Sequence, residues 1–466
     1  MQILTSSSAA AVAAPNRQEV MLCSLVILRK GGAEFLVSGQ APDYRLPTIE
    51  IPARQRIAPN LLPRIEESLG LHTVGRFLLG TDQRDLDKGC VVLDVIDPCA
   101  PDPAGHSWLS VSAIRWNDFA PEASDVLWSA LGRVSAYATG KRAGRFVEAG
   151  WFEEVRAWTE KTLTEYGLRL HGLRSQYNLG PDFALLRFAT SGSTVWFKAV
   201  GSRNAREFAI TWTLSDAGAP HTPRVLAFRE DWRAWLCLEA EGKHPDSQTA
   251  ETDWEVAARC LGELQIASIP HTDALLAAGA RDLRADHLYQ AIDSCLSRLG
   301  ALMKVQPAVP PHRLDAEAFE TIEIQLRQAC HRLGALGIPD TVGHSDLSAG
   351  NILISETDAV FLDLAETHVG LPFLTLAYLE LLAGTALCRK RAREAYLALW
   401  RPECSATQIE ALLDMTPLLA VFAYVLVCDD PGQHPEELSP ELARYLRSLA
   451  RRMHTEAQAL AAPASQ

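Results

Sequence analysis

The chain has 466 residues, of which 48% are hydrophobic, and a formal net charge of −13. This length and apolar content predict two or three domains, each with its own core. The acidic balance argues against a nucleic-acid-binding protein, because such proteins need basic surface to displace the counterions of the phosphate backbone.

The first 16 residues have neither a basic start nor a sustained apolar run. We therefore expect a flexible tail there rather than a secretion signal. Residues 17–148 predict a separate α/β module, with a strand over residues 21–28 and a helix over residues 61–71. A loop that starts near residues 45–47 is expected to join them.

The order of elements in residues 17–148 resembles a Nudix domain, in which a Gly-Gly turn leads to a helix ending in Arg-Glu-x-x-Glu-Glu-x-Gly. Aligned on Gly70, the first metal-binding glutamate of that family falls on Arg64 and the last on Ser68, which leaves only Glu67, and residues 48–49 read Thr-Ile. Hydrolysis of a diphosphate needs several carboxylates around Mg²⁺. We therefore expect a degenerate Nudix-like module that binds or scaffolds without cleaving, and a solvated helix face is the favoured explanation of the remaining glutamate.

Residues 149–242 predict a small lobe of strands with one inserted helix. Residues 185–190 and 195–200 have the composition of two strands around a Ser-Gly-Ser turn, and Lys198 lies on the second. A helix is expected to begin after Asn204, with Glu207 placed as in a capping box. On the residues alone, Glu207 completes a cap and Lys198 is a solvated edge charge, or both serve a binding site.

Two more strands are expected around residues 224–227 and 235–239, and residues 240–242 follow them. From there to residue 460 the apolar spacing is helical, which predicts a large helical lobe around one core. The apolar run of residues 417–428 is too short to span a bilayer and is expected to be a core helix, so we expect no membrane association. The ten cysteines form no Cys-x-x-Cys pair or His/Cys cluster, which favours reduced thiols, a cytoplasmic location and no structural zinc.

The most informative segment lies within that lobe and carries His344, Asp346 and Asn351, followed by an apolar run that ends at Asp363. Phosphoryl transfer from ATP needs an acid that orients and deprotonates a substrate hydroxyl, and oxygen ligands that hold Mg²⁺ on the phosphates. Asp346 fits the first role, and Asn351 and Asp363 fit the second. Residues 352–354 are expected to form a strand that turns back beside the strand before Asp363. The alternative is that these polar residues only cap a turn.

This segment resembles the His-Gly-Asp-Leu-x-x-x-Asn-Ile/Val-Leu loop of the aminoglycoside phosphotransferase and choline kinase group, which are small-molecule kinases with a protein-kinase-like two-lobe fold. The match departs at Ser345, where that family has Gly, and at Ala349, where Pro is frequent. The resemblance covers residues 168–380 and implies an α+β kinase-like fold, preceded here by the Nudix-like domain. It also implies that His344 supports the catalytic loop from its core side.

The resemblance further implies that Lys198 pairs with Glu207 and reaches the α and β phosphates of ATP. The strand end and hinge around Glu239 and Glu241 would contact the nucleotide, with backbone groups pairing with adenine. The phosphate-covering loop would be residues 177–182, although it holds only one glycine.

Only eight residues separate Asp363 from Pro372, and no Ala-Pro-Glu follows, so there is little room for a platform that docks a polypeptide substrate. This spacing favours a small-molecule hydroxyl acceptor. Glu366 and His368 are expected either to contact that acceptor or to be solvated loop residues.

The sequence therefore predicts a small-molecule kinase that uses ATP and Mg²⁺. The alternatives are a nucleotide-binding pseudokinase whose N-terminal module recruits a partner, and a Nudix hydrolase with a regulatory kinase-like tail. The residues do not identify the acceptor, distinguish ATP from GTP, or give the oligomeric state.

Overall fold

The computed structural model describes residues 20–53, 55–80, 88–97, 99–306, 310–429 and 438–462, so the predicted tail of residues 1–16 lies outside the described residues. The protein has mixed α and β structure and divides into two compact units. We call them the N-terminal unit, with residues 20–208 and 224–239, and the C-terminal unit, with residues 209–223 and 240–462.

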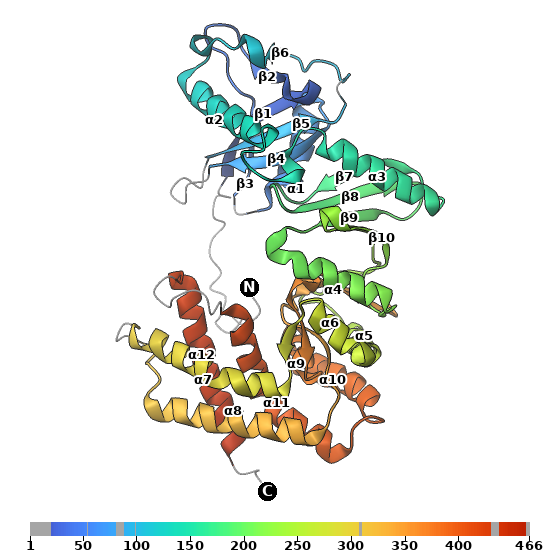
Figure 1. The fold of residues 1–466 in the computed structure, drawn as a ribbon, viewed down its shortest axis with the longest axis vertical. Coiled ribbons are helices and arrows are strands. Elements are labelled where there is room, and N and C mark those ends of the chain that lie inside the picture. Colours follow the sequence, from blue (N-terminus) through green and yellow to red (C-terminus); the bar gives the residue numbers. More distant parts are fainter. Residues whose placement is uncertain are drawn as a thin grey trace. The chain divides into compact units, whose positions relative to one another are not determined.

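The N-terminal unit begins with a six-stranded sheet in which β1 pairs with β5 in parallel and the other pairs are antiparallel (Figure 1). Side chains of β1 alternate between the faces, so that Leu25 and Ile27 join a core with α1, while Val26 and Leu28 join a core with α2. The elements are β1 (Val20–Arg29), β2 (Glu34–Ser38), β3 (Thr48–Pro52), α1 (Ile57–Leu69), β4 (Thr73–Leu79), β5 (Lys88–Val95), β6 (His106–Ser110) and α2 (Pro121–Ala138), with 3₁₀ turns η1 (Lys30–Gly32), η2 (Val111–Ala113), η3 (Trp116–Asp118) and η4 (Arg145–Val147).

The predicted strand and helix of this module are confirmed as β1 and α1. The helix begins earlier than expected, at Ile57, and ends before Gly70, whose φ of 67° is one that glycine adopts without strain. Residues 48–52, expected in a loop, form β3 because they pair with β1. Glu67 is exposed on α1, as expected for a solvated helix face.

A second sheet of the N-terminal unit has the strand order β10-β11-β9-β8-β7. Helix α3 packs on one face of it, where Trp151 and Phe152 meet Phe188 and Phe197 in one core. The predicted hairpin is confirmed, because β8 and β9 pair antiparallel. The elements are α3 (Trp151–Glu165), β7 (Leu170–Gln176), β8 (Ala184–Thr190), β9 (Val195–Ala199), η5 (Ser202–Asn204), α4 (Ala205–Asp216), β10 (Val225–Arg229), η6 (Glu230–Trp232) and β11 (Ala234–Leu238). Residues 209–216 of α4 belong to the C-terminal unit.

The C-terminal unit is a set of helices around one large core, with a three-stranded sheet of order β12-β16-β13 and the hairpin β14–β15 (Figure 1). Its helices are α5 (Glu251–Ser268), α6 (Thr272–Ala277), α7 (Ala285–Lys304), α8 (Ala316–Leu336), α9 (Phe373–Leu382), α10 (Ala386–Trp400), α11 (Ala406–Cys428) and α12 (Pro440–Ala461), with 3₁₀ turns η7 (Ile269–His271), η8 (Ala349–Asn351) and η9 (Leu364–Glu366). Its strands are β12 (Arg281–Leu283), β13 (Thr341–His344), β14 (Ile352–Ile354), β15 (Ala359–Phe361) and β16 (Thr367–Gly370).

Helix α11 is longer than the apolar run that predicted it, since its 23 residues start at Ala406 behind the capping residue Ser405. By length and composition it is the one helix of the described residues that could cross a membrane. Its central side chains, including Leu412, Leu419 and Phe422, are fully buried in the core of the C-terminal unit, as expected for a core helix. All ten cysteines of the chain are free thiols, as expected.

Candidate active site

His344 ends strand β13 and ties the loop that follows it to the chain just before Asp363. Its ring Nε2 lies 2.9 Å from the carbonyl oxygen of Leu362, and its backbone N–H donates to Oγ1 of Thr375 at 3.0 Å. Because a carbonyl only accepts, Nε2 carries the proton. Burial lowers the pKa of His344, and the nearby carboxylates oppose this only in part. The residue is therefore a neutral, buried support of the loop, which is the role implied by the resemblance.

Asp346 and Asn351 lie at the two ends of the loop between β13 and β14, and both are half-buried. The Asn351 side chain donates from Nδ2 to the backbone oxygen of Asp346 at 2.8 Å, and its N–H donates to the oxygen of Ser348 at 2.9 Å. The amide oxygen is thus turned away from the loop backbone. Asn351 therefore fixes the backbone that presents Asp346, a bond that both a turn cap and a metal ligand can make.

Strands β14 and β15 bring Asn351 and Asp363 together, as the sequence predicts. The register pairs Ile352 with Phe361, and the N–H of Leu362 donates to the oxygen of Asn351 at 2.8 Å. The next residue, Asp363, has a φ of +58° and is exposed. A non-glycine residue in this left-handed region costs on the order of 1–3 kcal/mol and is held there by its surroundings, so the backbone fixes the direction of this carboxylate.

The donors that Asn351 and Asp363 supply are an amide oxygen and a carboxylate. These are hard oxygen ligands of the kind that Mg²⁺ binds in phosphoryl-transfer sites, usually with several waters completing the shell. The two residues therefore fit Mg²⁺ by their chemistry, and Asn351 is bonded to the backbone of Asp346.

Of the two roles expected for Glu366 and His368, the structure contradicts one, that of a solvated loop residue for His368. His368 is fully buried in β16, where Nδ1 shares a hydrogen bond of 2.7 Å with Oγ of Ser345, and burial lowers its pKa to about 3. It is thus not a solvated loop residue, and its bond to the Ser345 hydroxyl is one that a glycine at position 345 could not make. Glu366 is half-buried and forms an ion pair of 3.0 Å with Arg281.

Gly343 is part of the same packing and was not singled out by sequence. A Cβ at this position would lie 2.1 Å from Nε2 of His368 and 2.7 Å from Oγ1 of Thr375. A glycine directly before the catalytic-loop histidine was the available signal, since it permits close packing at the end of a strand.

Lys198 and Glu207 lie in the N-terminal unit and are bonded to each other. Lys198 is on β9 and Glu207 is in the first turn of α4, with 2.5 Å between Nζ and Oε1. Glu207 is 2% exposed. The reading of Lys198 as a solvated edge charge is therefore wrong, and the pair expected from the resemblance is present.

The side chains of Glu239 and Glu241, at the expected hinge, have different surroundings. The carboxylate of Glu239 accepts a hydrogen bond of 2.8 Å from Arg187 and one of 3.2 Å from the indole of Trp196, so it belongs to the sheet. Burial alone would raise its pKa, but the bonds to Arg187 and Trp196 hold that pKa below its usual value. Glu241 is exposed, next to Gly242, which has a φ of 123°. A nucleotide contact through the Glu239 side chain would break its bonds with Arg187 and Trp196.

The predicted phosphate-covering loop, residues 177–182, lies between β7 and β8 and is docked on the first sheet. The N–H of Gly180 donates to the oxygen of Arg76 at 3.0 Å, and a Cβ on Gly75 would lie 2.1 Å from Leu179. The Gln176 side chain bonds both backbone groups of Gly75, at 2.8 and 2.9 Å. These contacts join positions about 100 residues apart, so sequence reasoning could not find them.

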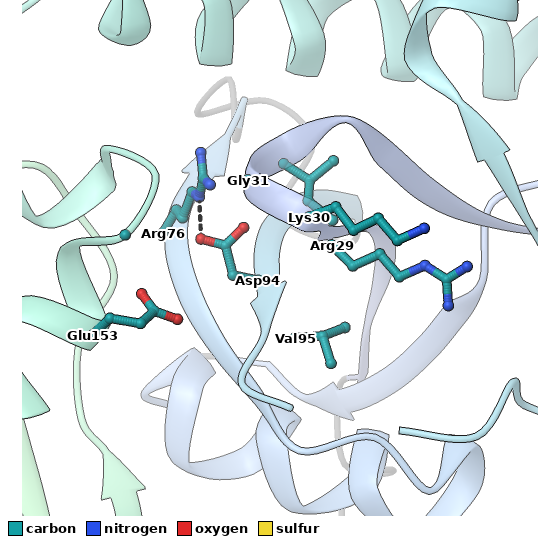
Figure 2. Close-up of a pocket in the computed structure, with 9 residues that line it drawn as sticks. Arg29, Lys30, Gly31, Arg76, Asp94, Val95 and Glu153 are labelled. Carbon is teal, nitrogen blue, oxygen red and sulfur yellow. Dashed lines mark hydrogen bonds and ion pairs between the residues drawn. The ribbon is translucent and has the colours of Figure 1, made fainter. Parts of the chain in front are cut away.

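A cavity of about 170 Å³ lies beside this docking point (Figure 2). Its wall includes Arg76, which is 2% exposed and bonds Asp94 at 2.5 Å, and Glu153 from α3 faces the same space. The Nη2 atom of Arg76 is buried without a partner among the described residues. Burial raises the pKa of Asp94 even though Arg76 opposes the shift.

The loop, the hairpin and Lys198 lie in one stretch of chain that matches a known family. Residues 198–411 match the model of the phosphotransferase enzyme family. The match to the phosphotransferase enzyme family begins at Lys198 and includes His344, Asp346, Asn351 and Asp363. No curated protein matches the sequence.

Solved structures similar to this chain include three small-molecule kinases. A macrolide 2′-phosphotransferase from Brachybacterium faecium is 17% identical, with a TM-score of 0.39 over 66% of this chain and 99% of its own. An ethanolamine kinase from Plasmodium vivax is 12% identical, with a TM-score of 0.42 over 68% and 91% of the two chains. A choline kinase from Streptococcus pneumoniae is 12% identical, with a TM-score of 0.38 over 65% and 99%.

Proposed function

We propose that this protein is an ATP- and Mg²⁺-dependent phosphotransferase that moves the γ-phosphate to a hydroxyl of a small molecule. The observation that carries this proposal is the platform made by Asp346, Asn351 and Asp363, which we call the catalytic platform. A loop and a hairpin with buried strands hold the three residues, within the stretch that matches the phosphotransferase family.

In this proposal Asp346 accepts the hydroxyl proton and orients the hydroxyl oxygen toward the phosphate. Asn351 and Asp363 hold Mg²⁺, which when bound neutralises charge on the phosphates. Lys198 binds phosphate oxygens, and the Glu207 carboxylate at 2.5 Å holds its ammonium in place. His344 positions the loop and does not react.

The acceptor is a small molecule in this proposal, because little chain follows the platform before the next helix. Asp363 is followed by η9 and β16, and α9 begins at Phe373. A docking surface for a polypeptide needs a longer segment between the metal-binding Asp and that helix. Aminoglycosides and choline-like amines are the acceptor classes to test first, since they are substrates of the group that the sequence resembles.

The remaining expectations belong to the same proposal. Residues 149–242 and 243–460 act as the two kinase-like lobes, and residues 17–148 are a Nudix-like module that does not cleave diphosphates. The protein works in the cytoplasm, without a membrane or nucleic acid as partner.

Thermal melting with and without ATP and Mg²⁺ tests the nucleotide site, because a ligand that binds only the native state raises the midpoint. We expect a magnesium-dependent rise that Asp363→Asn abolishes. Glu356→Gln is the matched control, because Glu356 is an exposed acid in the turn of the same hairpin. No rise at millimolar nucleotide would contradict the proposal and favour the pseudokinase alternative.

A further inference from the structure

Three potential metal ligands from distant parts of the sequence meet in the C-terminal unit. They are His221, between α4 and β10; Cys260, on α5; and Asp358, in the turn between β14 and β15. Nδ1 of His221 lies 2.7 Å from Oδ1 of Asp358, and Sγ of Cys260 lies 3.6 Å from the same oxygen. The three ligand atoms all lie within 4.8 Å of one another.

The far side of the His221 ring is fixed by a second carboxylate. Nε2 of His221 lies 2.7 Å from Oε2 of Glu263, and Glu263 is bonded by Arg259 at 2.8 Å. A histidine that binds a metal commonly donates its other ring N–H to a carboxylate, which sets the tautomer and the direction of the ring. Glu263 would leave Nδ1 as the ligand atom, and Nδ1 is the atom that faces Cys260 and Asp358.

We propose that His221, Cys260 and Asp358 form a binding site for a borderline divalent cation of the zinc type, with Glu263 orienting His221. An imidazole, a thiolate and a carboxylate are the three kinds of protein ligand that Zn²⁺ takes, and a water completes the tetrahedron. The hard cation Mg²⁺ does not select such a set, so the site is chemically distinct from the oxygen ligands Asn351 and Asp363.

The two distances to Asp358 suit a tetrahedral ion after a small movement of its carboxylate. With bonds of about 2.0 Å to nitrogen and oxygen and about 2.3 Å to sulfur, ligand atoms lie roughly 3.3–3.5 Å apart. The 3.6 Å between Cys260 and Asp358 already matches, whereas the 2.7 Å between His221 and Asp358 must widen. The Asp358 side chain is 52% exposed in its turn, so its carboxylate can rotate.

Cys260 distinguishes this site from a plain ion-pair network of His221 with its two carboxylates. Its side chain is fully buried, and its sulfur lies 3.6 Å from Oδ1 of Asp358. With metal, the S–H bond breaks, the S–Zn bond forms, and the proton goes to solvent, so the affinity rises with pH.

The site would hold together three segments of the C-terminal unit. It joins α5 to the chain after α4 and to the tip of the hairpin whose other end carries Asn351 and Asp363. Bound metal would therefore stabilise the folded unit and restrain that hairpin. The residues are 39 and 98 positions apart along the chain, which is why the cysteine and histidine spacing gave no sign of them.

The test is titration of the chelator-treated full-length protein with Co²⁺ and Zn²⁺, which needs no activity. We expect one equivalent of Co²⁺ to give thiolate-to-metal charge-transfer absorption, and Zn²⁺ to displace it and raise the melting midpoint. Cys260→Ser abolishes the absorption, and Glu263→Gln weakens Zn²⁺ binding by roughly 10- to 100-fold, the usual effect of losing an outer-shell partner. Cys295→Ser, at a buried cysteine of α7, is the control and keeps the wild-type spectrum.

Metal-free melting of each variant shows whether it folds, and His221→Gln provides a second ligand variant should Cys260→Ser be unstable. Absence of the charge-transfer band in the folded wild type would overturn the proposal. So would a band that persists in folded Cys260→Ser and His221→Gln.

Discussion

The buried ion pair between Arg76 and Asp94 should make the N-terminal unit intolerant of Arg76→Met. The Arg76 side chain is 2% exposed and that of Asp94 is 16% exposed, with 2.5 Å between Nε and Oδ2. Removing one partner of such a pair leaves an uncompensated buried charge and costs about 3–5 kcal/mol. For a unit of this size, that loss lowers the melting midpoint by about 6–20 °C.

The pH dependence of this loss identifies its cause. Burial already raises the pKa of Asp94, and Arg76 is the charge that holds it down. Without Arg76 the pKa of Asp94 in the folded protein rises further. The loss of unfolding free energy relative to the wild type is therefore smallest below the pKa of Asp in the unfolded chain, about 3.9, and it grows as the pH rises through the new folded-state pKa. We therefore expect Arg76→Met to be more destabilised at pH 8 than at pH 5, in urea unfolding followed by fluorescence.

Two further variants complete this experiment. Arg45→Met removes a surface ion pair of 2.8 Å, in which Arg45 is 68% and Asp43 is 59% exposed, and should cost less than about 1 kcal/mol. Arg76→Met/Asp94→Leu removes both charges and should recover much of the loss. A cost for Arg76→Met no larger than that of Arg45→Met, or one that does not change with pH, would refute the reasoning.

Three other outcomes are expected from the same structure. Lys198→Met should reduce phosphate transfer far more than Glu207→Gln, measured as kcat/KM for ATP, because the proposed function gives the phosphate contact to Lys198 alone; equal losses would contradict that role. His344→Gln should lower kcat while leaving the nucleotide Kd within about twofold, since His344 supports the loop and touches no substrate; an unchanged kcat would count against that support. Gly75→Leu should displace Leu179 and raise the KM for ATP, because a side chain at Gly75 would occupy the space of Leu179. An unchanged KM would show that the loop of residues 177–182 takes no part in nucleotide binding.

The local elements around the site were predictable because their signals are short-range. The hairpins β8–β9 and β14–β15 follow from apolar runs around turn residues, and the position of Lys198 follows from the first of them. Asp363 was placed correctly beside Asn351, although the strand ends at Phe361 and Asp363 itself takes a left-handed conformation. Spacing in the sequence does not show such a backbone change.

The errors came from contacts between distant residues. His368 lies in an apparently polar stretch, but β16 pairs with both β12 and β13, which buries it completely. The partners of the Glu239 carboxylate, Arg187 and Trp196 on other strands, were likewise not predicted. Burial and partners of polar side chains depend on tertiary pairing, which one sequence does not specify.

The most direct test of the catalytic platform is to compare Asp346→Asn with the wild type in acceptor-dependent ADP release, with the nucleotide Kd measured in parallel. We predict that kcat falls by about 10²- to 10⁴-fold, the usual contribution of a general base, while the Kd for Mg²⁺–ATP changes little. Wild-type turnover by Asp346→Asn would contradict the assignment of Asp346 and the proposed function with it.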